Sequence, residues 1–529
     1  MSTLTGLGPL IRFALRRDRV FLPVWVLSLV GITYATANAV ASTYNTPAEI
    51  QAYAANLGTS PATIAMAGPP VALEQIGGIL IYETSMTALL GTALMSVFLV
   101  VRHTRSEEEA GRTELLSSTV VAPQAGPVAA LVVALAAGVL VGLGVTWSLL
   151  SVDSATGPAL LFGAAVAAMG WVFAGVALVA AQLTTHARGS IGIGLAALGV
   201  AFGLRAVGDT SETFWSWLSP MGWSQQVRVF DDNRWWPLLL SVALTALLFA
   251  AAAVLSRRRD LGAGIVQPRP GPASARSALC TPLGLAWRLQ RASILGWTVG
   301  ILVTGLMFGS VTEEMRKMVE DNPTLAAYFE RIAGASLVDA FFSTAMLIMG
   351  ILAAGFAVAS ALRMRAEETS GRLEPVLSTG VSRSRWYAAS AAVTLVGTVL
   401  AVAAGGLGVG IAYAAVSGDG SAVWRLTGYV LVYLPAVLVL VGVALLLVGW
   451  VPRAAAAAWA ALAVCFVVGW LGGILSFPSW FENLSPFTHT PAVPAEELTA
   501  GPLLVIAAVA AAAAGLGLAG FLRRDVGRA

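Results

Sequence analysis

The sequence is poor in the residues that carry most phosphate chemistry. Its only lysine among 529 residues is Lys317, which stands in the segment MRKMVE. A phosphate-binding P-loop requires the pattern GxxxxGK[ST], because its lysine contacts the terminal phosphates of the nucleotide. ATP hydrolysis through a P-loop of this chain is therefore excluded.

Histidine and cysteine are almost as rare, and their placement excludes two further kinds of site. His103, His186 and His489 lie far apart in the chain, so no histidine-rich metal site is expected. Cys280 lies in a polar stretch and Cys465 in an apolar run, and two cysteines are too few for a thiolate metal cage. We expect two unpaired cysteines, no metal site and no catalytic residue.

Charge is scarce throughout the chain. Charged residues make up 11% of the sequence, against roughly a quarter in soluble domains, and hydrophobic residues make up 57%. This composition is typical of an integral membrane protein. The basic residues gather on one predicted side of the membrane, so nucleic acid is not an expected partner, whereas membrane lipids are.

Twelve apolar runs are long enough to cross the membrane as helices of about 20 residues. They cover residues 21–40, 77–101, 124–150, 157–182, 190–208, 236–255, 292–312, 339–361, 386–416, 422–450, 454–476 and 501–522. The sequence predicts an all-α polytopic membrane protein with two six-helix halves, residues 1–255 and 285–529. A linker rich in proline, glycine and arginine joins them over residues 256–284.

The distribution of arginine predicts the orientation of the spans. If the N terminus is cytoplasmic, 24 of the 31 lysine and arginine residues fall on the cytoplasmic side, as the positive-inside rule requires. Both termini are then cytoplasmic. Because each half has an even number of spans, the halves are expected to be parallel repeats related by an axis along the membrane normal.

The N-terminal segment has a helical pattern of its own. Apolar residues recur at helical spacing on one face and arginines occupy the other; they are Leu7, Leu10, Ile11, Ala14 and Leu15 against Arg12, Arg16 and Arg19. This pattern predicts an amphipathic helix on the membrane surface. The alternative is a basic flank that only orients the first span.

One charged segment occurs twice, at the same place in each half. Residues 105–119 (RSEEEAGRTELLSST, the first motif) and residues 365–379 (RAEETSGRLEPVLST, the second motif) are identical at eight of fifteen positions. The shared residues are Arg105/Arg365, Glu107/Glu367, Glu108/Glu368, Gly111/Gly371, Arg112/Arg372, Glu114/Glu374, Ser118/Ser378 and Thr119/Thr379. Repetition at one register, a shift of 260 residues, indicates a pair of equivalent docking surfaces.

The spacing of charges predicts how each motif is built. Glu108 and Arg112 are four residues apart, so a short helix along the cytoplasmic face would pair them. Gly111 permits either a sharp turn or the close approach of another backbone. A rigid charged knob between two spans is what a soluble motor subunit needs in order to push on membrane helices. The alternative is a solvated loop with chance charge pairs.

Two shorter matches support a duplication: Arg16, Arg19 and Trp25 correspond to Arg288, Arg291 and Trp297, and Leu218-Ser219-Pro220 recurs as Leu484-Ser485-Pro486. External helices are expected in TPAEIQAYAANL (residues 46–57) and in EEMRKMVEDNPTLAAYFERI (residues 313–332). The loop around the first Leu-Ser-Pro is dense in tryptophan. It is expected either as a short helical hairpin in the outer headgroup layer or as an aromatic belt that anchors two helix ends.

Candidate substrate contacts are few. Glu83 is the main charge within a predicted span and lies near its outer end, where it would meet a cationic substrate or would simply be a hydrogen-bonded carboxylate near the interface. Its counterpart Ser343 carries no charge. The tryptophans Trp215, Trp217 and Trp223 are the other candidates.

The sequence resembles permeases of the ABC-2 class, the membrane subunits of ATP-binding-cassette exporters, and within them the actinobacterial polyketide-antibiotic and tetronasin-type multidrug exporters. The resemblance rests on the EExxGRxE segments at residues 107–114 and 367–374, on LSPMGWSQQVRVFDDNRWWPLL and on the N-terminal helix. It implies a pseudo-dimer like the type V exporters in a bacterial plasma membrane. Pro375, where the first motif has Leu115, departs from strict repetition.

The resemblance also implies roles for the motifs. Each would be a coupling helix that inserts into one of two copies of a separate ATPase subunit, and those subunits would bind ATP and Mg; this chain itself would hold no cofactor. The coupling residues would be Arg105, Glu107, Glu108, Gly111, Arg112 and Glu114, with Arg365, Glu367, Glu368, Gly371, Arg372 and Glu374. The cargo would be a hydrophobic or amphipathic small molecule.

Two other classes of function stay open. An ion-coupled secondary transporter usually carries ionisable residues in mid-membrane, and the predicted spans are nearly free of charge. A membrane-embedded enzyme acting on lipid-linked substrates would need clustered Asp, Glu or His near one interface, and only isolated ones occur. Neither alternative accounts for the two motifs.

Overall fold

The structure is a computed structural model, and the contacts within it divide the chain into two units, Met1–Gly271 and Pro272–Ala529. It describes residues 5–56, 61–122, 124–152, 154–267, 273–275, 277–321, 336–475 and 478–526. Each unit is described by itself. All the regular elements in these ranges are helices, as predicted.

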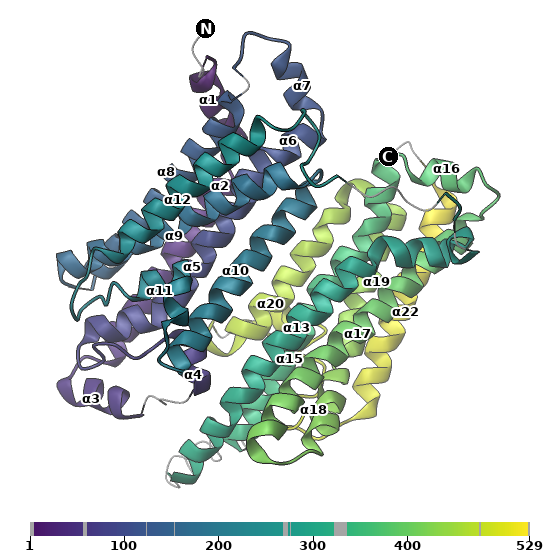
Figure 1. Cartoon of the computed structure of the whole chain (residues 1–529). Helices are drawn as coiled ribbons and strands as arrows, with labels where there is room; N and C mark the ends of the chain where they lie inside the picture. Colours follow the sequence, from purple (N-terminus) through teal and green to yellow (C-terminus); the bar gives the residue numbers. More distant parts are fainter. Residues whose placement is uncertain are drawn as a thin grey trace. The chain divides into compact units, whose positions relative to one another are not determined.

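Unit 1 contains six long helices and several short ones (Figure 1). The long helices are α2 (Phe21–Thr43), α5 (Ile76–His103), α8 (Ala125–Leu150), α9 (Thr156–Leu183), α10 (Ala187–Thr210) and α12 (Pro237–Ser256). The short ones are α1 (Leu7–Arg17), α3 (Pro47–Asn56), α4 (Pro61–Ala67), α6 (Arg105–Glu109), α7 (Arg112–Ser117), η1 (Phe214–Leu218) and α11 (Pro220–Gln225). Within this unit α6 and α7 lie at one end of the long helices, and α3 and α4 lie at the other.

Unit 2 repeats this plan with some helices joined or broken. Its elements are η2 (Ser277–Cys280), α13 (Pro282–Asp321), α15 (Leu337–Thr369), α16 (Leu373–Leu377), α17 (Arg383–Ser417), α18 (Ala422–Leu431), α19 (Leu434–Trp450), η3 (Pro452–Ala457), α20 (Ala458–Leu475), α21 (Ser479–Glu482) and α22 (Ala500–Arg523). Within it, α16 and α18 lie at opposite ends of the long helices (Figure 1).

Twelve candidate membrane spans occur among the described residues, which confirms the predicted number. The bounds of most spans agree with the predicted apolar runs within a few residues. The seventh span is the exception, because α13 begins at Pro282 rather than near residue 292. In unit 2 the residues from Pro282 onward therefore belong to the same helix as the span, whereas in unit 1 α1 and α2 are separate helices.

Small residues allow the spans to pack closely. In unit 1 a Cβ placed on Gly163 of α9 would lie 2.4 Å from the carbonyl oxygen of Gly142 on α8. In unit 2 a Cβ on Gly449 of α19 would lie 2.1 Å from the carbonyl oxygen of Gly517 on α22. Only glycine fits at such distances, so backbone contact between helices replaces side-chain interdigitation, as is common in membrane bundles.

The first part of the predicted linker belongs to unit 1. The backbone N–H groups of Ile265 and Val266 donate to the carbonyl oxygens of Gln182 and Leu183 at 3.1 and 3.0 Å. These are carbonyls of the last turn of α9, which have no partner within the helix. The segment after α12 is therefore held against the end of α9.

The segments predicted between the spans have mixed outcomes. The external helix predicted at residues 46–57 is α3. Its counterpart in the second half begins as the end of α13, and residues 322–335 lie outside the described residues. The amphipathic N-terminal helix is α1, whose Ile11 and Ala14 pack on the core of unit 1. The tryptophan-rich loop forms the two short helices η1 and α11, as the hairpin prediction required.

Candidate functional site

Each motif is a short turn between two helices rather than one continuous helix. In the first motif α6 ends at Glu109, Gly111 has a φ of 71° and α7 follows. In the second, α15 ends at Thr369, Gly371 has a φ of 69° and α16 follows. Both glycines have the positive φ that the turn requires, and no atom of the described residues lies within 4 Å of a Cβ placed on either of them.

Glu108 is held inside unit 1 by two arginines, which we call the first clamp. Its carboxylate accepts hydrogen bonds from Arg105 at 2.8 Å and from Arg259, just after α12, at 2.6 and 2.8 Å. Arg105 is fully buried and also donates to the carbonyl oxygens of Ala181 and Ala263, at 2.7 and 2.9 Å. The predicted pairing of Glu108 with Arg112 is wrong, because Glu108 points inward while Arg112 points outward.

Unit 2 repeats this arrangement in the second clamp. Glu368 accepts hydrogen bonds from Arg524 at 2.5 and 2.7 Å and forms an ion pair with Arg365 at 3.1 Å. Its side chain is only 2% exposed. Arg524 directly follows α22, just as Arg259 follows α12 by three residues. In both units the motif is therefore tied to the end of the sixth span.

The sequence carries a signal for the clamp that the analysis of the motifs missed. RRDLG at residues 258–262 recurs as RRDVG at residues 523–527, at a shift of 265 residues. The second arginine of each copy is the one that binds the motif glutamate. The shift differs from that of the motifs, so a search at one register does not find it.

A second, outer pair is also repeated. Arg112 donates to both carboxylate oxygens of Glu107 at 2.7 and 2.9 Å, and Arg372 donates to both of Glu367 at 2.8 and 3.2 Å. The hydrogen bonds that Arg372 donates to Glu367 raise the pKa of the Arg372 guanidinium above its ordinary value. Paired bonds of this kind fix the turn at the motif glycine.

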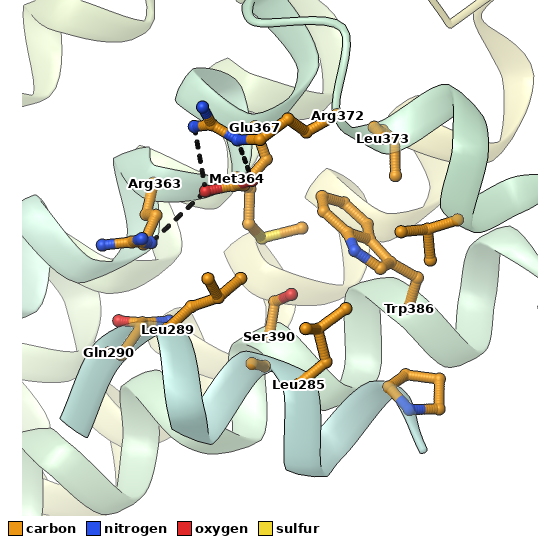
Figure 2. A pocket seen from close by; sticks show the side chains of 13 residues that line it. Leu285, Leu289, Gln290, Arg363, Met364, Glu367, Arg372, Leu373, Trp386 and Ser390 are labelled. Atoms are coloured by element: carbon orange, nitrogen blue, oxygen red, sulfur yellow. Dashed lines mark hydrogen bonds and ion pairs between the residues drawn. The ribbon is translucent and has the colours of Figure 1, made fainter. Parts of the chain in front are cut away.

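In each unit a further arginine binds the glutamate of the outer pair, and this arginine comes from a different place in the two units. Arg17 of α1 forms an ion pair with Glu107 in unit 1. In unit 2 the third partner of Glu367 is Arg363 of α15, at 3.5 Å. Figure 2 shows Glu367 between Arg363 and Arg372 at the edge of a pocket of about 40 Å³, which is large enough for water and too small for a drug.

The predicted coupling residues therefore fall into two groups. Arg105, Glu108 and Glu368 are buried or nearly so, and they connect each motif to its own unit. The surface is formed by other residues of the motifs. The exposed ones are Glu109, Ala110, Arg112, Glu114, Leu115, Leu116, Ser118 and Thr119 in the first motif and Ala366, Thr369, Ser370, Gly371, Arg372, Glu374, Pro375, Ser378 and Thr379 in the second.

A buried charge lies beside the first clamp and has no charged counterpart in unit 2. Asp18, between α1 and α2, is 1% exposed and accepts a hydrogen bond from Arg102 at 2.8 Å; it also pairs with the ring of His103. Burial alone would raise the pKa of Asp18, but these two partners together hold it below its ordinary value. The counterpart is Gln290, which accepts a hydrogen bond from Ser360 at 2.5 Å.

The four predicted substrate contacts are not brought together. Glu83 is exposed on α5 and accepts a hydrogen bond from the Tyr53 hydroxyl at 2.6 Å, as the hydrogen-bonded alternative required. Trp217 and Trp223 contact each other, because the Trp223 indole donates to the Trp217 carbonyl oxygen at 2.6 Å. Trp215 stacks on the neighbouring Phe214.

The view that Glu83 is the main charge within a span needs correction. Arg205 of α10, which lies within the predicted span at residues 190–208, is fully buried and pairs with Asp209 at 3.5 Å. Its guanidinium also donates to the carbonyl oxygens of Ile64 and Ala65 at the end of α4, at 3.2 and 2.5 Å. The Ile64 carbonyl also accepts a hydrogen bond from the backbone N–H of Gly68 at 2.8 Å, so Arg205 anchors the last turn of α4 to α10.

Metal ligands do not gather in the part of the chain that the structure describes, where no group of three or more His, Cys, Asp or Glu residues is placed to hold an ion. Both cysteines are free, Cys280 exposed and Cys465 buried, as predicted.

Comparison with known proteins bears on this architecture. The chain is 41% identical over 529 residues to the multidrug efflux system permease protein Rv1217c of Mycobacterium tuberculosis, and the match covers 99% of this chain and 96% of the relative. The chain belongs to this permease family. The profile of the family described as multidrug efflux system permease Rv1217c, C-terminal domain, matches residues 279–522 of this permease, which include all six spans of unit 2. The prediction of a multidrug efflux permease in the membrane is thereby confirmed.

Proposed function

We propose that this permease is the membrane subunit of an ATP-binding-cassette exporter of the ABC-2 class, in the tetronasin-type branch. It moves hydrophobic or amphipathic compounds out of the cell across a bacterial plasma membrane. The name of its relative, a multidrug efflux system permease, supports drugs as cargo. Energy comes from two copies of an ATPase subunit that bind ATP and Mg, and this chain binds neither.

The observation that carries the proposal is the repeated clamp. An exposed short helix, α7 or α16, is joined through a buried glutamate to an arginine at the end of the sixth span. A partner that pushes on α7 therefore moves the end of α12 with it, and one that pushes on α16 moves the end of α22. Two such surfaces in one chain support two ATPase copies.

The orientation belongs to the same proposal. Both motifs, both clamps and both termini face the cytoplasm, where a soluble ATPase is available. The excess of arginine on this side supports the assignment. Glu74 and Glu497 precede α5 and α22, at the ends of these helices opposite the motif and the clamp, and so face outward.

The test reverses charge on the exposed part of both motifs while leaving the clamps intact. Glu114→Arg combined with Glu374→Arg is expected to abolish drug efflux and co-purification with the ATPase, with normal amounts of permease in the membrane. Glu74→Arg combined with Glu497→Arg is the matched control, because these glutamates are also exposed. Unchanged efflux in the motif variant, or drug transport by the purified chain alone in vesicles, would overturn the proposal.

One observation favours the ion-coupled alternative enough to require a test. The buried pair Arg205–Asp209 is an ionisable site within a span of the kind that proton-coupled carriers use. The ABC-2 proposal predicts that efflux continues when an ionophore removes the proton gradient and cellular ATP is maintained. The carrier alternative predicts that efflux stops under the same conditions.

A further inference from the structure

Unit 1 has a groove beneath its motif, at a place where unit 2 is filled by aromatic side chains. The groove has a volume of about 620 Å³ and lies between α8, α9 and α12. Its inner wall is apolar and includes Leu131, Leu178, Phe249 and Ala252. Polar side chains stand only at the end near the first motif. A cavity of this size and character binds an apolar or amphipathic molecule.

The difference between the units follows from two positions. At the register of the motifs, Pro127 of α8 corresponds to Tyr387 of α17; at the register of the RRDxG segments, Ser256 of α12 corresponds to Phe521 of α22. In unit 2 the ring centroids of Tyr387 and Phe521 lie 5.7 Å apart, Trp386 also stacks on Phe521, and all three side chains are buried. In unit 1, Pro127 and Ser256 both line the groove. The space that aromatic rings occupy in unit 2 is thus open in unit 1.

The groove follows the helices away from the motif. Its lining runs from Gln124 to Leu131 on α8 and from Phe249 to Ser256 on α12, which corresponds to a depth of roughly 10 Å at the helical rise per residue. This is the depth over which the upper part of an acyl chain lies in one leaflet.

The two helices that border the groove also carry apolar side chains that the chain leaves uncovered. On α8, Leu140 and Leu143 are 50% and 56% exposed, and on α12 Leu239 and Leu247 are 68% and 66% exposed. Exposed leucines on membrane spans face lipid tails. The groove therefore lies between helices that contact lipid.

The mouth of the groove carries a positive charge that is not used elsewhere among the described residues. Arg259 is neutralised by Glu108 in the first clamp, but neighbouring Arg257 is exposed, lines the groove and takes part in no ion pair in the described part of the chain. Thr113 and Gln124 add side-chain donors beside it. Unit 2 has Leu522 in place of Arg257. Guanidinium groups bind phosphate through paired, charge-assisted hydrogen bonds.

We propose that this groove binds one anionic phospholipid of the adjacent leaflet, with an acyl chain between α8 and α12 and its phosphate on Arg257. Glu108 and Gln182 also line the groove, and Arg259 donates to Gln182 at 2.6 Å. The bound lipid therefore lies against the first clamp and stabilises it, so unit 1 depends on anionic lipid and unit 2 does not. This inference requires only that the chain is embedded in a membrane, and it stands or falls independently of the ATPase partner.

The experiment measures retained lipid on the full-length permease. Purified protein is stripped of lipid, supplied with phosphatidylglycerol or phosphatidylcholine, and examined by native mass spectrometry. Wild type is expected to retain one phosphatidylglycerol in preference to phosphatidylcholine. Arg257→Leu is expected to reduce that preference roughly fivefold, the effect of one cation at an anionic headgroup. Arg258→Leu is the control, since Arg258 is equally exposed and lies outside the lining.

A second variant fills the groove with the side chains of unit 2. Pro127→Tyr combined with Ser256→Phe, both at positions that line the groove, is expected to abolish the retained lipid while thermal stability is kept, which shows that the protein is folded. Retention equal to wild type in this variant or in Arg257→Leu overturns the proposal. Unchanged lipid retention together with lost drug binding would also overturn it, by assigning the groove to the exported compound.

Discussion

The two units hold their motifs with the same clamp but surround it with different side chains. In each, a motif glutamate is bound by an arginine from the motif and by another after the sixth span. Beside the clamp, unit 1 has the open groove and unit 2 has the stacked Trp386 and Phe521. The connection between motif and span is thus the same in the two units, while the packing around it differs.

The junction before the first span of each unit diverged as well. In unit 1 the amphipathic helix and the span are separate, and the buried Asp18 lies in the break between them with Arg102 and His103. In unit 2, α13 runs through the same place without a break and Gln290 makes a neutral hydrogen bond to Ser360. A buried charge needs charged partners, whereas a neutral amide does not, so unit 1 depends more strongly on pH and on charge substitutions.

Four predictions test this comparison. The largest effect is expected at the aromatic side chains that fill the space beside the second clamp. Trp386→Ala should destabilise unit 2 by about 3–5 kcal/mol, because it leaves a cavity beside Phe521. The measurement is thermal unfolding of the purified permease, with hydrogen exchange to locate the loss in unit 2. Gly126→Ala at the counterpart position should be neutral or stabilising by up to about 1 kcal/mol, since it adds a helix former in open space. A similar loss at both positions would refute the difference in filling.

Substitutions in the two clamps should cause the next largest losses of stability. Arg259→Ala leaves Glu108 with Arg105 alone and should cost about 3 kcal/mol, the effect of breaking a buried ion pair. Arg524→Ala should cost less, because Arg259 also donates to Gln182 and Ala263. Unfolding temperatures of both variants test this order, with Arg258→Ala as the matched control.

A charge exchange sharpens the same comparison. Glu108→Arg combined with Arg259→Glu should recover part of the stability that either single change removes. If the double variant loses as much stability as the two single variants together, the two residues are not coupled and the assignment of the first clamp is wrong.

Asp18 should give a smaller, pH-dependent effect. Asp18→Asn loses charge-assisted hydrogen bonds and should cost about 2 kcal/mol at pH 7. Because the folded state holds the pKa of Asp18 below its ordinary value of 3.8, this contribution is fully present above that value and is lost as the pH falls below it. The difference in unfolding free energy between wild type and Asp18→Asn should therefore be constant from pH 7 to about 5 and shrink below about 4.

The control for this prediction lies in unit 2. Gln290→Glu keeps the shape of the side chain and adds a charge beside Ser360, in a pocket whose two arginines, Arg363 and Arg372, are already paired with Glu367. This variant should destabilise the protein at pH 7, and the lost stability should return in acid. Its pH dependence is therefore expected to differ from that of Asp18→Asn. The same direction in both variants would contradict the assigned environments.

The smallest effects should be equal in the two units. Gly111→Ala and Gly371→Ala place a side chain at a positive φ in open space, so only backbone strain is added, about 1 kcal/mol each. Unfolding of the two variants in parallel measures this. A much larger loss at one of them would mean that this glycine also meets another surface.

The helical class, the twelve spans and the duplication were determined by the sequence alone. Apolar runs of about 20 residues have one stable arrangement in hydrocarbon, since every backbone group must be satisfied within the helix. Repetition of RSEEEAGRTELLSST at one register also located the two motifs without any structure.

Only the tertiary structure decided which motif residues face inward and which outward. Glu108 and Arg112 have the spacing of an intrahelical pair, but Glu108 lies near Arg259, which is 151 residues away, and a buried carboxylate is more stable with two cations than with one. Likewise the groove exists because Pro127 and Ser256, where unit 2 has Tyr387 and Phe521, come together in space, and neither segment alone shows that they meet. Spacing along one helix is local, whereas burial depends on which distant segments pack beside it.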